Sequence, residues 1–377
     1  MITAPAWFCR PAARQWRALV RQTAAPAFHA ELPGYRPTEL TELPVLATEL
    51  GVGRVFVKDE STRLGLGAFK VLGASWAIAR LLSDRSQVTR DKGRQVTLAG
   101  LRRAAAADPV ELVTATDGNH GRAVAWMARL VGLEARVFVP DVVPERARTA
   151  ILAEGATVTV AGGSYDEAVE QAAAYADEGR LLVQDTAWAG YESVPGWIVE
   201  GYGTLLAELD EQFAQRGLAG PDLVSVPVGV GSLAQAVVTH YRRGEGFPGG
   251  MRGGGAPAVL AVEPTTAAGV LASLRADTRQ SVPTGGTVMA GLNCGTPSYL
   301  AWPVLAGGLD AAVAVTDDLA TGAGADLGRL GVRSGPSGAA SLAGVRTALT
   351  GPGSRARRAG LGVTASSVVL LLSTEGT

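Results

Sequence analysis

The sequence predicts an α/β protein with mostly parallel sheets that are covered by helices on both faces. Short apolar runs of strand length alternate along the chain with longer amphipathic segments. This pattern is typical of parallel sheets buried between two layers of helices. The length of 377 residues is sufficient for two domains of ordinary size, or for one large core with an inserted lobe.

The strands are predicted where β-branched and aliphatic residues cluster between turn residues. In chain order they cover residues 54–60, 110–116, 134–140, 156–162, 180–186, 222–229, 258–264 and 366–374. Helices are predicted between them, over residues 70–84, 122–132, 145–155, 164–179 and 230–244. The low-complexity segments 244–257 and 351–360 are predicted to be surface loops.

Composition and charge exclude several classes of protein. Hydrophobic residues make up 47% of the chain, the net charge is −1 and the pI is about 6.4, so neither nucleic acid nor a membrane surface is expected as a partner. The N-terminal residues lack the apolar stretch of a signal peptide, and no window reaches the ~20 apolar residues of a membrane span. We therefore expect a soluble, cytoplasmic protein. Two cysteines and three scattered histidines predict neither a disulfide framework nor a metal site.

The first turn with unusual chemistry surrounds Lys70, which lies between Phe69 and Val71 in a Gly-rich segment. Burial of an ammonium group is costly unless the charge is paired or neutralised. One interpretation is a lysine in the first turn of a helix whose amine reaches out to water. The other is a lysine held close to neutral so that its nitrogen can form a Schiff base.

A second turn, residues 115–125, brings Asp117, Asn119 and His120 together between two glycines. Glycine lets the backbone approach a ligand closely, and the following helix offers free N–H groups. An ordinary Asp-Gly turn with a helix cap would explain the same residues. In the functional interpretation, we expect Thr116, Asp117 and His120 to contact the substrate.

A third turn, residues 227–238, also joins a strand to a helix. Gly229, Val230, Gly231 and Ser232 can present backbone N–H groups and a hydroxyl to a phosphate, aided by the helix dipole. The segment matches neither the G-x-G-x-x-G nor the Walker A pattern. By itself it is equally consistent with a plain strand-to-helix turn.

The three turns together predict a pyridoxal phosphate site. The aldehyde of this cofactor needs an amine, its ring oxygen needs a hydrogen-bond donor such as Asn119, and its phosphate needs an anion site. A nicotinamide cofactor would need no buried lysine and would place its glycines after the first strand.

Longer segments are more specific, notably "VKDESTRLGLGAFKVLGAS", "TATDGNHGRAVAW", "DTAWAGYESVPGWIVEGY" and "MAGLNCGTP". In them, and from about residue 28 to its last residues, the chain resembles the diaminopropionate ammonia-lyase family of fold-type II pyridoxal-phosphate enzymes. The resemblance implies two open, twisted, mostly parallel sheets flanked by helices, with the cofactor in the cleft between two domains. We expect a large domain over 1–90 and 203–377 and a small domain over 91–202. The resemblance also implies a homodimer.

Carried over residue by residue, the resemblance implies that Lys70 is the Schiff-base lysine and that Asn119 pairs with the ring oxygen. Ser373 would face the pyridine nitrogen, where a hydroxyl leaves that nitrogen unprotonated and suits the ring to β-elimination. The phosphate would be held by Gly229, Val230, Gly231 and Ser232.

Asp117 and Asp185 match the acidic residues of the family's active site, although Asp185 could instead cap the turn after its strand. The implied activity is elimination of ammonia from the amino acid 2,3-diaminopropionate, D or L, giving pyruvate and ammonia. Lys70 would act as base for the L form, and Asp117 would act as base for the D form or protonate the leaving amine. Desolvation by apolar neighbours and the Schiff base itself are both expected to keep the Lys70 nitrogen uncharged and nucleophilic.

Three departures from the family pattern leave the substrate open. Pro336 stands where an acidic residue is usual, Asn293 and Thr296 occupy variable or acidic positions, and the chain stops at Thr377 where the family continues. One alternative is a β-replacement or dehydratase-type enzyme for a related amino acid in specialised metabolism. Another is a non-catalytic homologue that binds pyridoxal phosphate.

Overall fold

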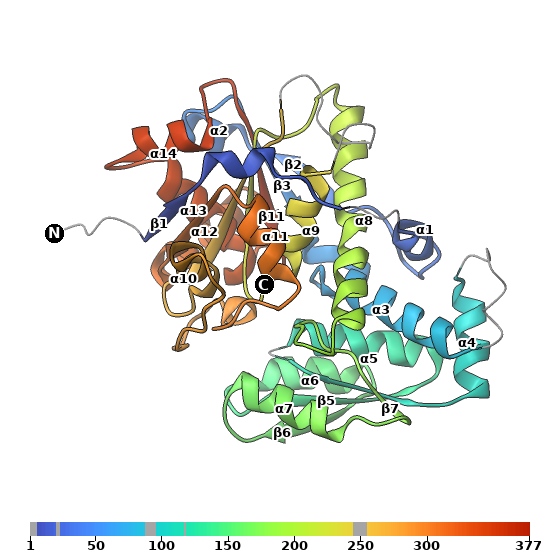
Figure 1. Cartoon of the computed structure of the whole chain (residues 1–377). Coiled ribbons are helices and arrows are strands. Elements are labelled where there is room, and N and C mark those ends of the chain that lie inside the picture. The colour runs from blue at the N-terminus through green and yellow to red at the C-terminus, as the bar shows by residue number, and fades with distance from the viewer. Residues whose placement is uncertain (1–5, 20–22, 87–95, 117, 244–254) are drawn as a thin grey trace. The chain divides into compact units, whose positions relative to one another are not determined.

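The computed structural model describes residues 6–19, 23–86, 96–116, 118–243 and 255–377. The chain divides into two compact units, each built on one sheet with helices around it (Figure 1). Unit 1 comprises Met1–Gln22, Pro37–Thr62 and Leu205–Thr377. Unit 2 comprises Thr23–Arg36 and Arg63–Thr204.

Unit 1 contains a seven-stranded sheet in the order β1-β10-β9-β8-β11-β3-β2. Strands β10, β9, β8, β11 and β3 run parallel to one another, and β1 and β2 are antiparallel at the edges. The strands are β1 (Trp7–Cys9), β2 (Glu39–Glu42), β3 (Arg54–Asp59), β8 (Leu223–Pro227), β9 (Ala258–Pro264), β10 (Ala311–Val315) and β11 (Val368–Ser373). Every residue of β8, β9 and β10 is buried, as expected for parallel strands covered on both faces.

The helices of unit 1 surround this sheet, and α13 packs against four of its strands, β8, β9, β10 and β11. They are α2 (Pro44–Leu50), α9 (Ser232–Tyr241), α10 (Gly269–Ala276), α11 (Ala301–Gly308), α12 (Asp317–Arg329), α13 (Pro336–Leu349) and α14 (Ser354–Leu361), with short 3₁₀ turns η1 (Pro11–Gln15) and η4 (Ala290–Leu292). Aliphatic side chains of the strands, α2, α12 and α13 form one core.

Unit 2 contains a four-stranded parallel sheet in the order β6-β5-β4-β7. Its strands are β4 (Glu111–Ala115), β5 (Glu134–Pro140), β6 (Thr157–Ala161) and β7 (Arg180–Leu182). Its helices are α1 (Ala25–Ala30), α3 (Lys70–Arg85), α4 (Leu98–Ala107), α5 (Asn119–Val131), α6 (Glu145–Ala153) and α7 (Tyr165–Tyr175). The long helix α8 (Ser193–Gln215) and the 3₁₀ turn η2 (Glu60–Gly65) each contribute residues to both units.

The division differs from the expected one, which assigned residues 1–90 to the large domain. In the structure Thr23–Arg36 and the residues from Arg63 onward belong to unit 2. The physical reason is the packing of α3, which contacts α5, α4 and α1. Almost every apolar residue of α3 is buried, so this helix is part of the core of unit 2.

Two predicted elements end at different residues from those expected. The helix expected at 122–132 begins already at Asn119, because Thr116 Oγ1 accepts the backbone N–H groups of Gly118 and Gly121 and closes the turn. The strand expected at 180–186 ends at Leu182, since the Gln184 N–H donates to the Tyr191 hydroxyl at 2.9 Å and not to the sheet.

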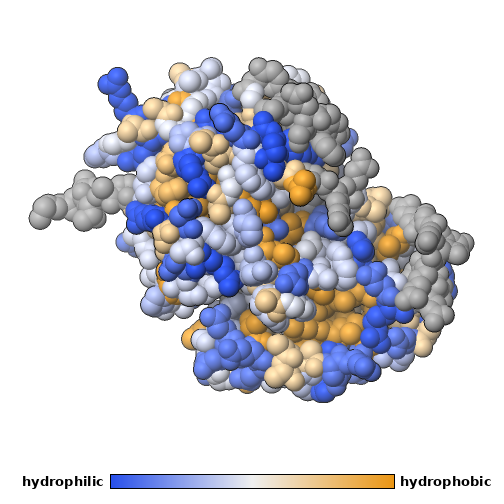
Figure 2. All heavy atoms as spheres, viewed as in Figure 1, coloured by the Kyte–Doolittle hydropathy of each residue, from blue (hydrophilic) through white to orange (hydrophobic). Residues whose placement is uncertain are grey.

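Within the described ranges, no helix is long and apolar enough to cross a membrane. Polar and apolar side chains are mixed on the face seen in Figure 2. Large apolar side chains that are exposed come from both units, among them Val45, Val142, Leu152 and Leu319. Single exposed apolar residues of this kind are ordinary for a folded chain.

Candidate active site

The functional loops of unit 2 leave two neighbouring strands at the same edge of the sheet. The chain passes from β4 to β5 to β6 in one direction and then returns to the other side of β4 for β7. Such a switch point is where open α/β sheets bind ligands, beyond the carboxyl ends of the strands. Hydrogen bonds join the two loops: His120 Nε2 donates to the Val183 carbonyl at 2.8 Å, and Gln184 Oε1 accepts from Ala115 N at 3.0 Å.

Lys70 is the first residue of α3, and its Nζ forms a short ion pair with Oδ2 of Asp185. The exposed fraction of the side chain is 20% for Lys70 and 5% for Asp185. The structure therefore does not show a lysine that reaches out to water. In the cofactor-free chain a carboxylate faces the Lys70 nitrogen, so its surroundings are not purely apolar.

The charge state of Asp185 follows from opposing influences. Burial raises the pKa of this carboxyl group, but the charges of Lys70 and His120 and hydrogen bonds from Lys70 and Tyr165 lower it to about 2. Asp185 is therefore ionised at neutral pH. A carboxylate that only caps the turn after its strand would not pair with Lys70, so this alternative does not account for the ion pair.

Two residues that the sequence did not single out hold Asp185 in place. Tyr165 Oη donates to Asp185 Oδ1 at 3.4 Å, and Gln184 Nε2 donates to Tyr165 Oη at 2.8 Å. Tyr165 is the first residue of α7, and a capping box between Ser164 and Glu167 fixes the start of that helix. The one signal in the sequence was the position of Tyr165 just after the predicted strand at 156–162.

His120 lies in the first turn of α5 and is buried. Burial lowers the pKa of its imidazole, although the charge of Asp185 raises it, so that the net direction is downward and the ring is neutral. Since Nε2 donates to the Val183 carbonyl, Nδ1 is left as a hydrogen-bond acceptor. Among the described residues it has no partner.

Thr116 and Asn119 occupy the same loop, and Asp117 lies outside the described residues. The Thr116 oxygen accepts the N–H groups of Gly118 at 2.9 Å and Gly121 at 3.0 Å, so its hydroxyl proton is the atom left for a contact with substrate. Asn119 begins α5 and is partly exposed at the carboxyl edge of the sheet.

The expected phosphate loop follows β8 in unit 1. A Cβ atom at Gly229 would lie 2.9 Å from the carbonyl oxygen of Gly291, and one at Gly231 would lie 2.9 Å from Leu305 Cδ1. Gly231 also has φ of +97° and is the N-cap residue of α9, which begins at Ser232; a glycine at this position supplies no capping side chain. Backbone N–H groups at a helix start are suited to an anion such as a phosphate.

Ser373 ends β11, the neighbour of β8 in the sheet. The strands β8, β9 and β10 follow one another in one direction, while β11 and β3 lie on the other side of β8. The phosphate loop and Ser373 therefore lie at the switch point of the sheet of unit 1. Ser373 is fully buried, and its Oγ donates to Ser334 Oγ at 2.8 Å.

The residues present fit pyridoxal phosphate: an amine held by a carboxylate, a helix start with glycine as its N-cap residue, and a buried hydroxyl. A model of the pyridoxal-phosphate dependent enzymes matches residues 31–370, and the chain belongs to this family. It is similar to the diaminopropionate ammonia-lyase of Salmonella typhimurium, with 37% identity over 303 residues, 78% of this chain and 72% of the relative. The Escherichia coli K12 enzyme of the same name is 35% identical over 359 residues, 93% of this chain and 86% of the relative.

Solved structures agree with this placement. The E. coli diaminopropionate ammonia-lyase in complex with an aminoacrylate-PLP azomethine reaction intermediate aligns with a TM-score of 0.79 and 32% identity, over 99% of this chain and 90% of that chain. The complex of the same enzyme with D-serine aligns with a TM-score of 0.82 and the same identity and coverage. These comparisons confirm the predicted fold class, the family and the cofactor. The roles of individual residues remain predictions.

Proposed function

We propose that this chain eliminates ammonia from 2,3-diaminopropionate, in the D or L form, and releases pyruvate and ammonia. The observation that carries this proposal is the ion pair of Lys70, which is largely buried, with the buried Asp185 at the carboxyl edge of the sheet of unit 2. The similarity to diaminopropionate ammonia-lyases over most of the chain supports it. A small amino acid as substrate agrees with the D-serine bound to the E. coli relative.

Pyridoxal phosphate, when bound, supplies a carbonyl that attaches an amino acid and an electron sink that makes the α-proton acidic. Lys70 Nζ would provide the covalent attachment, and Asn119 would donate to the ring oxygen. Ser373 would donate to the ring nitrogen once its hydroxyl turns from Ser334 Oγ. The phosphate would be held by Gly229, Val230, Gly231 and Ser232.

Asp185 first orients Lys70 and then becomes a stronger base. While Lys70 is charged, the pKa of Asp185 is about 2, so the Asp185 carboxylate is a weak base. The proton between the two groups then stays on Lys70 Nζ. Burial is the largest influence on this carboxyl group, so its pKa rises once Lys70 no longer carries a positive charge. Asp185 Oδ2 can then hold a proton during turnover.

Further roles in proton transfer and substrate binding are assigned to Lys70 itself and to residues of the turn at 115–125. Lys70 removes the α-proton of the L form and Asp117 that of the D form. His120 Nδ1, an acceptor without a partner among the described residues, accepts an N–H of the substrate amine. The Thr116 hydroxyl donates to the substrate carboxylate.

Reduction with borohydride tests the attachment site. The chain has three lysines, Lys58, Lys70 and Lys92, so a reduced adduct can be assigned by peptide mapping. We expect the adduct on Lys70 alone, its loss in Lys70→Ala, and its retention in the control Lys92→Ala. Lys58 is fully buried with Nζ 2.7 Å from Glu208 Oε2, and an adduct there would refute the assignment.

Pyruvate release from each enantiomer of diaminopropionate tests the reaction. We expect release from at least one of them by the wild-type chain and none by Lys70→Ala. Turnover of threonine or serine alone would show a dehydratase, and an adduct without any turnover would show a non-catalytic homologue. A homodimer and a cytoplasmic location remain predictions.

A further inference from the structure

Tyr202 on α8 carries a hydroxyl for which the fold gives no reason. Its side chain is fully buried, and Oη has no hydrogen-bond partner among the described residues. A buried polar group without a partner destabilises the folded chain, and such groups are rare in native proteins. A bound molecule that accepts this hydrogen bond would account for it.

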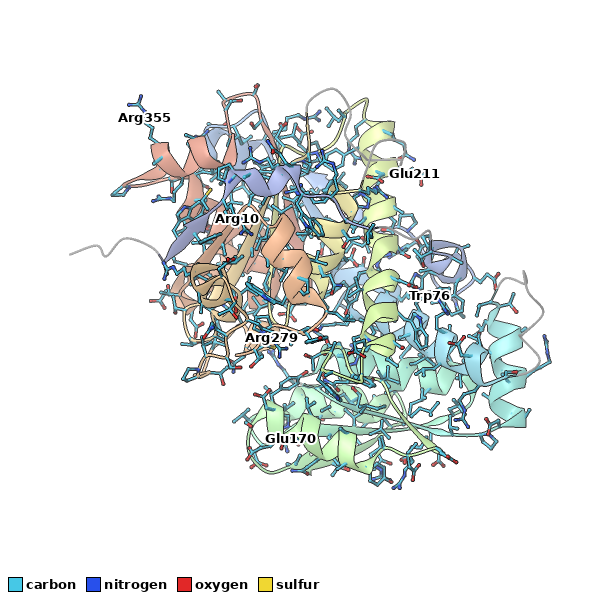
Figure 3. The ribbon with its side chains drawn as sticks, viewed as in Figure 1. Arg10, Trp76, Glu170, Glu211, Arg279 and Arg355 are labelled. Carbon is cyan, nitrogen blue, oxygen red and sulfur yellow. The ribbon has the colours of Figure 1, made fainter. Side chains whose placement is uncertain are left out.

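The ring of Tyr202 is fixed where α3 and α8 cross. A Cβ atom at Gly73 would lie 2.6 Å from Tyr202 Cε1, and one at Gly201 would lie 2.3 Å from the Leu72 carbonyl oxygen. The two helices therefore approach so closely that only glycine fits at these two positions. Further along α3, Trp76 Nε1 donates to Glu200 Oε2 of α8 at 3.1 Å, and Figure 3 shows Trp76 beside that helix. The hydroxyl cannot swing away to find a partner elsewhere.

The charges of Lys70 and Asp185 both act on the Tyr202 hydroxyl. The Phe69 ring has its centroid 5.6 Å from Lys70 Nζ and 4.8 Å from the centroid of the Tyr202 ring. Burial raises the pKa of Tyr202, while the charge of Lys70 lowers it and that of Asp185 raises it. The phenol therefore stays protonated, and it can donate a hydrogen bond but cannot act as a base.

We propose that Tyr202 Oη donates a hydrogen bond to an acceptor atom of the molecule bound at Lys70, either the cofactor or the amino acid that it attaches. The proposal rests on the function proposed for Lys70. It makes Tyr202 a binding residue of the site. Tyr202 Oη can donate and His120 Nδ1 can accept a hydrogen bond, and neither atom has a partner in the part of the chain that the structure describes.

The variant Tyr202→Phe removes only the hydroxyl and keeps the ring against Gly73. In the cofactor-free chain the hydroxyl is unpaired, so we expect the thermal midpoint of the variant to be equal to the wild-type value or higher. With ligand, one ordinary hydrogen bond is lost, which corresponds to roughly a five- to tenfold weaker affinity. If the acceptor is on the cofactor, the dissociation constant of pyridoxal phosphate rises. If it is on the amino acid, KM rises and cofactor affinity is unchanged.

Tyr191→Phe is the matched control for stability, because the Tyr191 hydroxyl is used within the fold. It donates to the Leu182 carbonyl and accepts the Gln184 N–H, each at 2.9 Å, so its loss should lower the midpoint of the cofactor-free chain. The proposal is overturned if Tyr202→Phe behaves like this control, or if cofactor affinity and KM both stay at wild-type values, as a buried water partner would give. Peptide mapping of the borohydride adduct tests Lys70 independently of both results.

Discussion

The charge state of each titratable residue at the site depends on two opposing influences, burial and the charges of its neighbours. Asp185 illustrates this, because burial raises the pKa of its carboxyl group, yet the charges of Lys70 and His120 beside it lower the pKa to about 2. Likewise, His120 is neutral because burial outweighs the charge of Asp185. These residues form one electrostatic unit, and a change in the charge of Lys70 alters the proton affinity of Asp185.

The pair predicts a specific loss of stability in acid. The pKa of Asp185 is lower in the folded chain than the ordinary value of 3.8, so folding favours the ionised form. The resulting stabilisation is complete above about pH 4 and falls as the pH approaches about 2, by about 2 kcal/mol in total. Urea unfolding of the cofactor-free chain at several pH values measures this loss. Between about pH 4 and about pH 2 the free energy of unfolding should fall less in Asp185→Asn than in the wild type. Equal slopes in variant and wild type would contradict the assigned ion pair.

Among the elements, α3 and α8 show how small residues position the site. Gly73 and Gly201 let the backbones meet, and this close crossing fixes both the Tyr202 ring and the helix that begins with Lys70. The lysine is thus placed by a packed helix and not by a free loop. Rigid support of this kind is what a reacting group requires.

Closing the space at this crossing should destabilise the chain. In Gly201→Ala, the new methyl group would lie 2.3 Å from the Leu72 carbonyl oxygen, which forces the helices apart at a cost of about 1–3 kcal/mol. Gly203→Ala in the same helix is the control, because its Cβ would meet only Thr23 Cγ2 at 3.8 Å. We expect Gly203→Ala to equal or exceed the stability of the wild type in urea unfolding. Equal stability of both variants would show that the crossing tolerates separation.

In the whole molecule, each sheet places its functional residues at its own switch point. In unit 2 these are the loops after β4 and β7, and in unit 1 they are the phosphate loop after β8 and Ser373 at the end of β11. The same topological rule thus applies in both units. Cofactor binding should therefore stabilise the folded chain against unfolding.

The cofactor should raise the free energy of unfolding by about 2.7 kcal/mol at a free concentration of 100 times its dissociation constant. Gly231→Asp places a negative charge and a side chain in the phosphate loop and should lose most of this increment. Gly217→Asp is the control, since Gly217 also has a positive φ, +69°, but has open space around it. Gly217→Asp can lower the free energy of unfolding of the cofactor-free chain, but the increase on cofactor binding should be unchanged. An unchanged increment in Gly231→Asp would exclude this loop as the phosphate site.

The sequence by itself determined the local features of this protein. The continuous apolar runs of β3, β8 and β9 predicted buried parallel strands, and the Gly-rich turns indicated a cofactor site with Lys70 at its centre. Such features depend on neighbours along the chain, so their patterns are visible in the sequence. The edge strands β1 and β2 were missed, because they have only three and four residues. The buried strand β10 was missed as well, and the segment 351–360, expected to be a surface loop, contains helix α14.

Only the tertiary structure decided which groups meet. Lys70 and Asp185 are 115 positions apart in the sequence, and neither residue's surroundings reveal that they form an ion pair. Tyr165, Gln184 and Tyr202 lie within ordinary helix and strand patterns and gain their significance from the side chains that packing brings beside them. Charge state and hydrogen bonding depend on distances between segments that are remote along the chain. Local propensity carries no information about those distances, so the electrostatics of the site follow from the fold.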